Sequence, residues 1–278
     1  MSKVIRLKTK ILLEGLLFPE NPRWHDGKLW FSDMDLKKVF TIDLDGNQET
    51  IIEMQNSPGG LGWTPDNKLL VVSMQDQRLL RLNNEELTEV ADLSSFVTYS
   101  CNDMVVDKQG RAYIGYFGFD WAIGAPFVPA KVILVMPNGK ARVVAEDMAF
   151  PNGSVITPDD RTLIIAETFA ARLTAFSIQK DGSLSERRVW AQLKSGVPDG
   201  ICLDEEGAIW MAAPGIGKVL RILEGGIITH KVKVSTQAYA CMLGGPNRKT
   251  LYVTTSTHDR LNGKLEDVEV DVPGAGLP

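Results

Sequence analysis

The hydrophobic and polar positions of this chain follow one pattern, written six times at intervals of roughly 40 to 50 residues. Each copy has a small or polar residue, an apolar run, a turn rich in Pro, Asp, Asn or Gly, and a second run of β-forming residues. Helical periodicity is nearly absent. A repeat of this length built from β-rich units is typical of the blades of a β-propeller.

Each repeat predicts four antiparallel strands. The two runs that flank the turn predict a β-hairpin, and third and fourth runs of β-forming residues follow in most copies. The second strands are expected at residues 28–32, 69–73, 111–115, 162–166, 208–212 and 250–254. We therefore expect an all-β fold, a six-bladed β-propeller of four strands per blade around a central channel, as a single domain over residues 1–278.

The two ends of the chain are expected to close the ring. The sixth repeat is short after Thr257, but residues 267–272 still alternate as a strand, and residues 10–14 near the N-terminus are also β-forming. Pairing of these two regions would remove two exposed sheet edges, which is how a propeller avoids edge-to-edge aggregation.

Composition and charge narrow the partners. The net charge of −5 offers no basic footprint for nucleic acid. No apolar run approaches the roughly 18 residues of a membrane span, and the N-terminus lacks a signal-peptide pattern. Cys101, Cys202 and Cys241 are odd in number and widely spaced, which argues against a disulfide framework and favours small buried side chains. We expect a cytoplasmic protein, either a monomer or a small homo-oligomer.

The repeat aligns one position at the start of the first strand of each copy. The aligned residues are Glu20, Gly59, Asn102, Asn152, Asp199 and Ala240. The four oxygen-bearing ones would converge on the channel axis at one mouth of the propeller. Capping of turns by Asn and Asp is the alternative, but Glu is a poor turn residue and four repeats share the feature. The oxygen set predicts one divalent cation per chain, Ca²⁺ first and Mg²⁺ or Mn²⁺ next. Zn²⁺ is less well matched because it prefers His and Cys.

The second strands should end at the same mouth as the aligned residues, because they run back from the hairpin turns. This places Phe169 and His258 on the rim, where His258 is a candidate to touch substrate. The third repeat carries an insertion at residues 116–130, rich in aromatics, Gly and Pro, that starts at this mouth. It is either a packed surface loop or a lid that makes the pocket apolar, with Phe119 and Trp121 facing the substrate.

The segments around the aligned positions resemble a known family over essentially the whole chain. They read Pro-Glu-Asn-Pro-Arg-Trp at 19–24, Cys-Asn-Asp-Met at 101–104, Pro-Asn-Gly-Ser at 151–154 and Pro-Asp-Gly-Ile at 198–201. Together they resemble the SMP-30/gluconolactonase/luciferin-regenerating-enzyme family. The resemblance implies a six-bladed propeller with one divalent ion in the channel and a small-molecule lactone or ester as substrate.

The resemblance also implies roles for single residues. Glu20, Asn152 and Asp199 would bind the ion directly, and Asn102 would lie in or next to the ligand shell and contact substrate or a bound water. Asp199 would double as general base or nucleophile for hydrolysis.

One departure from the family bears on the substrate. Members that open sugar lactones often carry an Arg two residues before the Asn that matches Asn102, and here that residue is Ser100. Together with the aromatic insertion, Ser100 favours a less polar lactone or ester. The expected substrate-binding residues are Ser100, Asn102, Phe119, Trp121, Phe169 and His258.

Two other functions fit the same sequence. The propeller could bind calcium as a regulatory protein without turnover. It could also perform non-hydrolytic chemistry like that of strictosidine synthase, although such enzymes need a rim acid and tolerate loss of the ion ligands, so the intact oxygen set counts against them.

Overall fold

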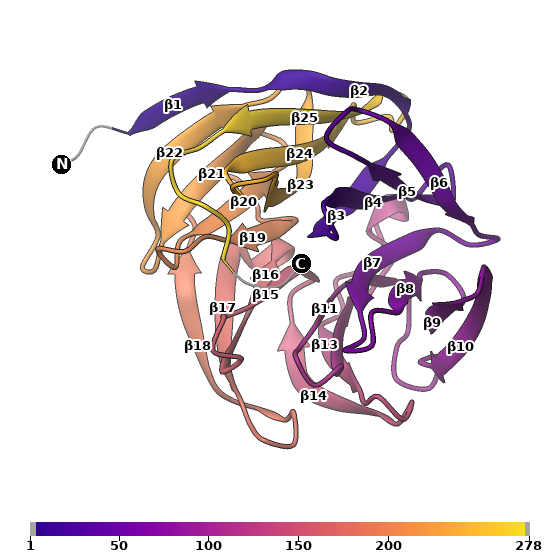
Figure 1. The fold of residues 1–278 in the computed structure, drawn as a ribbon. Helices are drawn as coiled ribbons and strands as arrows, with labels where there is room; N and C mark the ends of the chain where they lie inside the picture. The colour runs from indigo at the N-terminus through magenta and orange to yellow at the C-terminus, as the bar shows by residue number, and fades with distance from the viewer. Residues whose placement is uncertain (1–3, 276–278) are drawn as a thin grey trace.

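The computed structural model describes residues 4–275, which form six sheets arranged as blades around a channel, each with four antiparallel strands (Figure 1). The innermost strands of blades 1 to 6 are β3 (Pro19–His25), β7 (Pro58–Trp63), β11 (Cys101–Val106), β15 (Pro151–Ile156), β19 (Ile201–Leu203) and β23 (Gln237–Gly244). The second strands are β4 (Lys28–Asp33), β8 (Leu69–Ser73), β12 (Ala112–Tyr116), β16 (Thr162–Glu167), β20 (Ile209–Ala213) and β24 (Thr250–Ser256). The predicted six-bladed propeller is confirmed.

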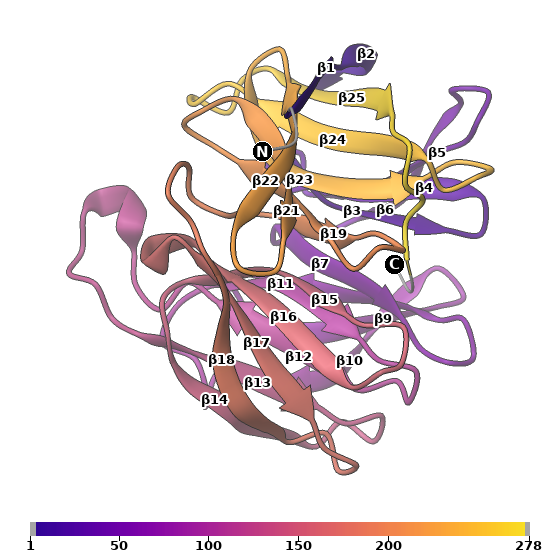
Figure 2. The ribbon, with the colours of Figure 1, turned by 90° about the vertical axis from the view of Figure 1, so that its left-hand side faces the viewer.

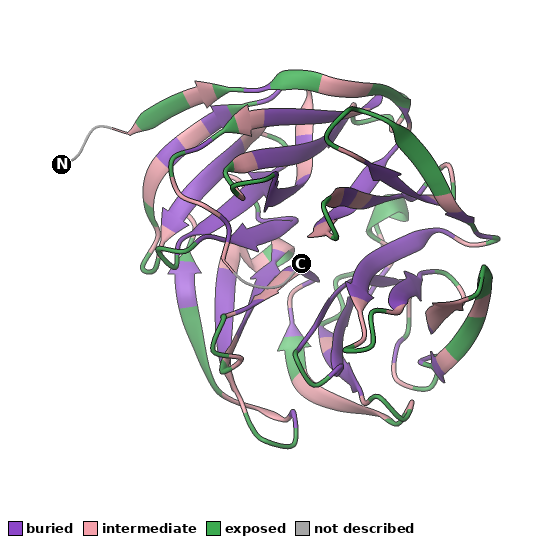
Figure 3. Cartoon of the chain, viewed as in Figure 1, coloured by how far each residue is buried: buried purple, intermediate pink, exposed green. Residues whose placement is uncertain are grey.

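The outer half of each blade follows the same order. The third strands are β5 (Lys38–Ile42), β9 (Arg78–Asn83), β13 (Ala130–Val135), β17 (Arg172–Ile178), β21 (Lys218–Leu223) and β25 (Gly263–Glu269). The outermost strands are β6 (Gln48–Glu53), β10 (Glu86–Asp92), β14 (Ala141–Met148), β18 (Leu184–Gln192), β22 (Ile227–Lys233) and β2 (Lys10–Leu16). Burial decreases from the channel outward, since the inner strands are buried and the outermost strands are largely exposed (Figure 3).

The N-terminal segment closes the ring, as the sequence predicts, but its partner strand is Gly263–Glu269 rather than residues 267–272. β2 pairs antiparallel with β25 and becomes the outermost strand of blade 6, with Lys10 opposite Asp267. β1 (Ile5–Lys8) was not expected; it pairs in parallel with β22 and adds a fifth strand to blade 5. Buried Glu266 lies at this junction and accepts hydrogen bonds from the hydroxyls of Thr9, Ser235 and Thr255. The same short segment therefore ties blades 5 and 6 together.

A β-bulge interrupts the innermost strand of five blades close to the aligned position. The register shifts between Glu20 and Arg23 in blade 1, and the other shifts are Pro58/Leu61, Cys101/Met104, Pro151/Ser154 and Ala238/Ala240. A bulge bends its strand and re-aims the side chains of the extra residues. Glu20, Asn102 and Asn152 lie within these bulges and line the cavity at the channel mouth.

Glycine lets neighbouring blades approach closely at the axis. A Cβ on Gly153 would lie 2.5 Å from the backbone nitrogen of Ile201 and 2.7 Å from the carbonyl oxygen of Asp199. Any side chain here would push blade 5 away from blade 4. The glycine therefore lets Asn152, the residue before it, lie close to Asp199 of the next blade.

The insertion of blade 3 stands above one mouth of the channel. It contains η1 (Trp121–Ile123), whose magenta coil projects at the left-hand side of the molecule in Figure 2, and the neighbouring blade contributes η2 (Thr168–Ala170). Gly118 and Gly124 have φ of 83° and 69°, a conformation that glycine adopts without strain. Among the residues the structure describes, no helix is long and apolar enough to cross a membrane.

Candidate functional site

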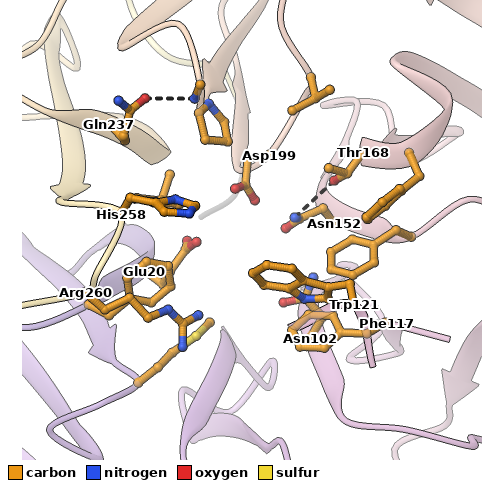
Figure 4. Close-up of a pocket in the computed structure, with 18 residues that line it drawn as sticks. Glu20, Asn102, Phe117, Trp121, Asn152, Thr168, Asp199, Gln237, His258 and Arg260 are labelled. Atoms are coloured by element: carbon orange, nitrogen blue, oxygen red, sulfur yellow. Dashed lines mark hydrogen bonds between the residues drawn. The ribbon is translucent and has the colours of Figure 1, made fainter. Parts of the chain in front are cut away.

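A cavity of about 420 Å³ opens at the mouth that carries the insertion (Figure 4). Its floor is formed by Glu20, Asn102, Asn152 and Asp199, which come from four different blades and are all buried. The structure therefore brings together the four oxygen-bearing residues that the repeat aligns. At the sixth aligned position the structure is shifted by one residue from the expectation. Tyr239 lines the cavity, whereas Ala240 is buried against Gly200.

The amide groups of the floor are oriented by hydrogen bonds through their nitrogens. Asn102 Nδ2 donates to the carbonyl of Pro151 at 3.4 Å, and Asn152 Nδ2 donates to Thr168 Oγ1 at 3.3 Å. Because the amide nitrogens donate hydrogen bonds within the protein, both amide oxygens are available to a ligand.

The two carboxyl groups of the floor destabilise each other's charged form. Burial raises the pKa of Glu20 to about 8, and the charge of Asp103 adds to the effect. Burial also raises the pKa of Asp199 well above its ordinary value, with the charge of Glu20 as the next cause. A cation bound between these two buried acids would favour the charged form of both.

The residues at the floor fit a divalent cation with oxygen ligands. Within residues 4–275, no three His, Cys, Asp or Glu side chains are grouped so as to hold a metal by themselves. The amide oxygens of Asn102 and Asn152 would therefore have to complete a ligand set with the two carboxylates. Hard cations such as Ca²⁺ accept such a mixture of carboxylate and amide oxygens.

A buried ion pair lies in the channel next to the floor, and the sequence did not point to it. Arg23 Nη2 donates to Asp103 Oδ1 at 2.6 Å and to the carbonyl of Met104 at 2.8 Å. Both side chains are almost fully buried. Arg23 also borders a second, much smaller cavity of about 20 Å³. The guanidinium of Arg23 is thus engaged by Asp103 and links the innermost strands of blades 1 and 3.

One side of the cavity is an aromatic wall made of Phe117, Trp121, Phe150 and Phe169. The rings of Phe117 and Phe150 stack at 4.7 Å between centroids, and Phe150 contacts Phe169 at 5.1 Å. Trp121 and Phe169 are 44% and 53% exposed, so they present apolar surface at the cavity that a ligand could cover. Phe150 was not expected; it adopts φ of 61°, a rare conformation for a bulky residue.

Two predicted substrate-binding residues do not line the cavity. Phe119 lies behind the aromatic wall, buried, with its ring 5.2 Å from that of Phe169. Ser100 holds the start of the insertion, because its carbonyl accepts a hydrogen bond of 3.1 Å from the backbone nitrogen of Phe117. Asn102, Trp121, Phe169 and His258 all line the cavity.

The opposite side of the cavity carries the polar groups of Gln237, Tyr239, His258 and Arg260. The ring of Phe18 lies among them, in contact with Tyr239 and Arg260. Gln237 accepts a hydrogen bond of 2.8 Å from the backbone nitrogen of Gly215, so its amide nitrogen is free to donate. Burial raises the pKa of Tyr239, which keeps its hydroxyl protonated. Figure 4 shows Gln237, His258 and Arg260 across the floor from Trp121 and Phe117. Of these four residues, only His258 was expected from the sequence.

Comparison with known proteins agrees with this architecture. A pentonolactonase of Haloferax volcanii is 25% identical over 90% of this chain and 86% of its own length. A regucalcin of Xenopus laevis is 25% identical over 96% of this chain and 91% of its own length. The solved structure of a calcium-binding protein, regucalcin, from Agrobacterium tumefaciens matches with a TM-score of 0.84 and 22% identity, covering 100% of this chain and 99% of that one.

The family pattern described as the SMP-30/Gluconolactonase/LRE-like region matches residues 18–257. This range holds the four floor residues, the aromatic wall and most of the six blades. The chain belongs to the SMP-30/gluconolactonase/LRE-like family.

Proposed function

We propose that this protein is a divalent-metal-dependent hydrolase that opens lactones or related esters. The observation that carries the proposal is the buried floor, where two mutually repelling carboxyl groups and two free amide oxygens face one cavity. Lactone hydrolysis is the activity named for the Haloferax relative, and calcium binding is the property named for the Agrobacterium structure. Both names are consistent with this floor.

Glu20, Asn152 and Asp199 would hold the ion, with Asn102 completing the set or contacting a bound water. A divalent ion in this position supplies a Lewis acid for the ester carbonyl and a lower pKa for the attacking water. Asp199 would accept the proton of that water or attack the carbonyl itself. The burial of the floor limits competing water.

Turnover of a panel of lactones and aryl esters, with Ca²⁺ and after EDTA treatment, tests this proposal. EDTA-sensitive hydrolysis supports it. A chain that binds Ca²⁺ tightly by calorimetry and turns over nothing is instead a calcium-binding propeller, the function that the regucalcin relatives suggest. Consumption of a lactone without release of its hydroxy acid would indicate non-hydrolytic chemistry.

The aromatic wall predicts a preference for apolar substrates. Replacing Trp121 or Phe169 with Ala should raise KM for alkyl- and aryl-substituted lactones about 10-fold, because each ring covers apolar substrate surface worth about 25 cal/mol per Å². KM for gluconolactone should change little, since its hydroxyl groups gain nothing from an apolar wall. Steady-state kinetics on matched lactones measures both effects.

Ile227→Ala is the matched control, because Ile227 is an exposed apolar residue on β22 and does not line the cavity. A wild-type protein that hydrolyses gluconolactone with higher kcat/KM than γ- or δ-alkyl lactones would contradict the apolar preference. The proposed ion site would be unaffected by that result.

A further inference from the structure

Five blades share a turn whose fourth residue has a left-handed backbone. The residue four positions after the end of the second strand has φ between 47° and 61° in each of them. These residues are Lys37, Gln77, Ala171, Gly217 and Arg260. In blades 1, 2, 4 and 5 the carbonyl of this residue accepts a hydrogen bond from a backbone nitrogen just past the outermost strand. The backbone of this residue thus stabilises the blade, and its side chain can differ from one blade to the next.

In blades 1 and 2 the side chain at this position hydrogen-bonds to the backbone of the fold. Lys37 Nζ donates to the carbonyl of Gln55, and Gln77 Nε2 donates to the carbonyl of Tyr99. The residues of blades 4 and 5 are Ala and Gly, which have nothing to donate. Arg260 alone of the five lines the cavity. The third strand of its blade, β25, begins only at Gly263, so a longer connection follows Arg260 than follows its counterparts.

Two contacts hold the guanidinium of Arg260 in place without occupying all of its N–H donors. Its Cζ lies 3.8 Å from the centre of the Phe18 ring, a cation–π contact. Its Nη1 donates to Asp35 Oδ1 at a long 3.4 Å, which is the one side-chain hydrogen bond of Arg260 within residues 4–275. An arginine has five N–H donors, so most of them remain for a ligand. Arg260 interacts with the acidic floor by charge alone, since among the described residues it forms no hydrogen bond to Glu20 or Asp199.

We propose that Arg260 binds a carboxylate or comparable oxyanion on the substrate, and that the substrate is a lactone with an apolar substituent at its other end. This inference rests on the proposed lactone hydrolysis. Guanidinium groups match the geometry of oxyanions with paired hydrogen bonds. The neighbouring groups of Gln237, Tyr239 and His258 can also donate hydrogen bonds, so the polar side as a whole suits an acceptor. Because the aromatic wall lies across the floor from Arg260, one molecule can reach both sides (Figure 4).

A matched pair of substrates tests the anchor. One is a phenyl-substituted γ-butyrolactone with a carboxylate on the ring carbon opposite the phenyl group, and the other is its methyl ester. The wild-type protein should hydrolyse the carboxylate with about 10- to 100-fold higher kcat/KM, and Arg260→Gln should abolish that preference through KM. Arg260→Lys should retain part of it. Lys37→Gln, the same turn position outside the cavity, should change neither substrate.

Two results would overturn the anchor: equal losses on both substrates in Arg260→Gln, or a wild-type preference for the methyl ester. A second experiment uses the lactam analogue of the carboxylate substrate, in which a ring N–H replaces the ring oxygen so that the ring is not hydrolysed. Its binding to Ca²⁺-loaded protein, measured by calorimetry, separates this inference from the proposed function. Binding that Arg260→Gln weakens at least about 10-fold, in a protein that opens no lactone, would leave the anchor standing and refute the hydrolase. Lactam binding that is absent, or unchanged in Arg260→Gln, refutes the anchor.

Discussion

Replacing Asp199 with Asn should reduce kcat for every lactone that the wild-type protein opens by at least about 1,000-fold, the cost typical of removing a catalytic base or nucleophile. Asn has nearly the shape of Asp, so the buried side chain can still pack beside Asn152. It loses the charge and the ability to take a proton. Single-turnover and steady-state kinetics at saturating Ca²⁺ measure the loss, and elemental analysis of each sample reports the metal content.

The metal content matters because Asp199 would also be an ion ligand. Glu20→Gln removes the other carboxylate of the floor without removing the proposed base, so it should be rescued in part by high Ca²⁺, whereas Asp199→Asn should not. Asp159→Asn is the neutral control, since Asp159 caps an exposed turn, well away from the cavity lining, through Thr157 and Arg161. Wild-type kcat in Asp199→Asn at matched metal content would refute the assignment.

Asp204 lies in the same repeat and does not serve as a control. It follows β19 at the hairpin turn, where it is buried and accepts hydrogen bonds from Trp210 Nε1 at 3.1 Å and Arg221 Nε at 2.7 Å. Removing it would leave the buried Nε of Arg221 and the indole N–H of Trp210 without their acceptor, with Glu206 as the remaining carboxylate partner of Arg221. Unsatisfied buried donors of this kind cost about 1–3 kcal/mol each. A loss of activity in Asp204→Ala would therefore report unfolding rather than chemistry.

The fold was predictable because it is repetitive. One strand pattern recurs in every blade, so errors in a single copy do not change the architecture, and the pairing of β2 with β25 follows from the strand that blade 6 lacks. The floor was predictable for the same reason, since equivalent positions of a closed ring meet at its axis. Glu20, Asn102, Asn152 and Asp199 each occupy such a position.

The rest of the site depends on breaks in the repeat, which the pattern alone does not reveal. The bulge in β23 turns Tyr239 rather than Ala240 to the cavity. The insertion folds back on itself, so Phe119 packs against Phe169 while Trp121 reaches the cavity. Arg260 reaches the site through a longer connection in one blade only. In each case the deciding quantity is a local backbone conformation set by packing between distant segments.

Removing divalent ions should lower the thermal stability of this protein and make it sensitive to pH. An ion held by four blades binds only the folded chain, and at about 1,000 times its Kd it stabilises that state by about 4 kcal/mol. For a chain of this size, that corresponds to a drop in Tm of about 8 °C when Ca²⁺ is replaced by EDTA. Glu20→Gln should show a much smaller drop, because it removes one of the two carboxylates. An unchanged Tm in EDTA, together with no metal by elemental analysis, would contradict the ion site.

The pH dependence follows from the two carboxyl groups of the floor. In EDTA, the folded chain holds a proton on Glu20 up to pH of about 8, whereas the unfolded chain releases it near its ordinary pKa of 4.5. The folded state therefore binds more protons between these values, and its free energy of unfolding must fall as pH rises through the window. Ca²⁺ requires the deprotonated carboxylates, so its stabilisation should grow with pH over the same window. Thermal melts from pH 5 to pH 8 should show Tm in EDTA falling and the gap between Ca²⁺ and EDTA widening. Glu20→Gln should make the fall less steep, since it removes one of the two groups that titrate. A gap that narrows with pH in the wild-type protein would mean that these carboxylates do not hold the ion.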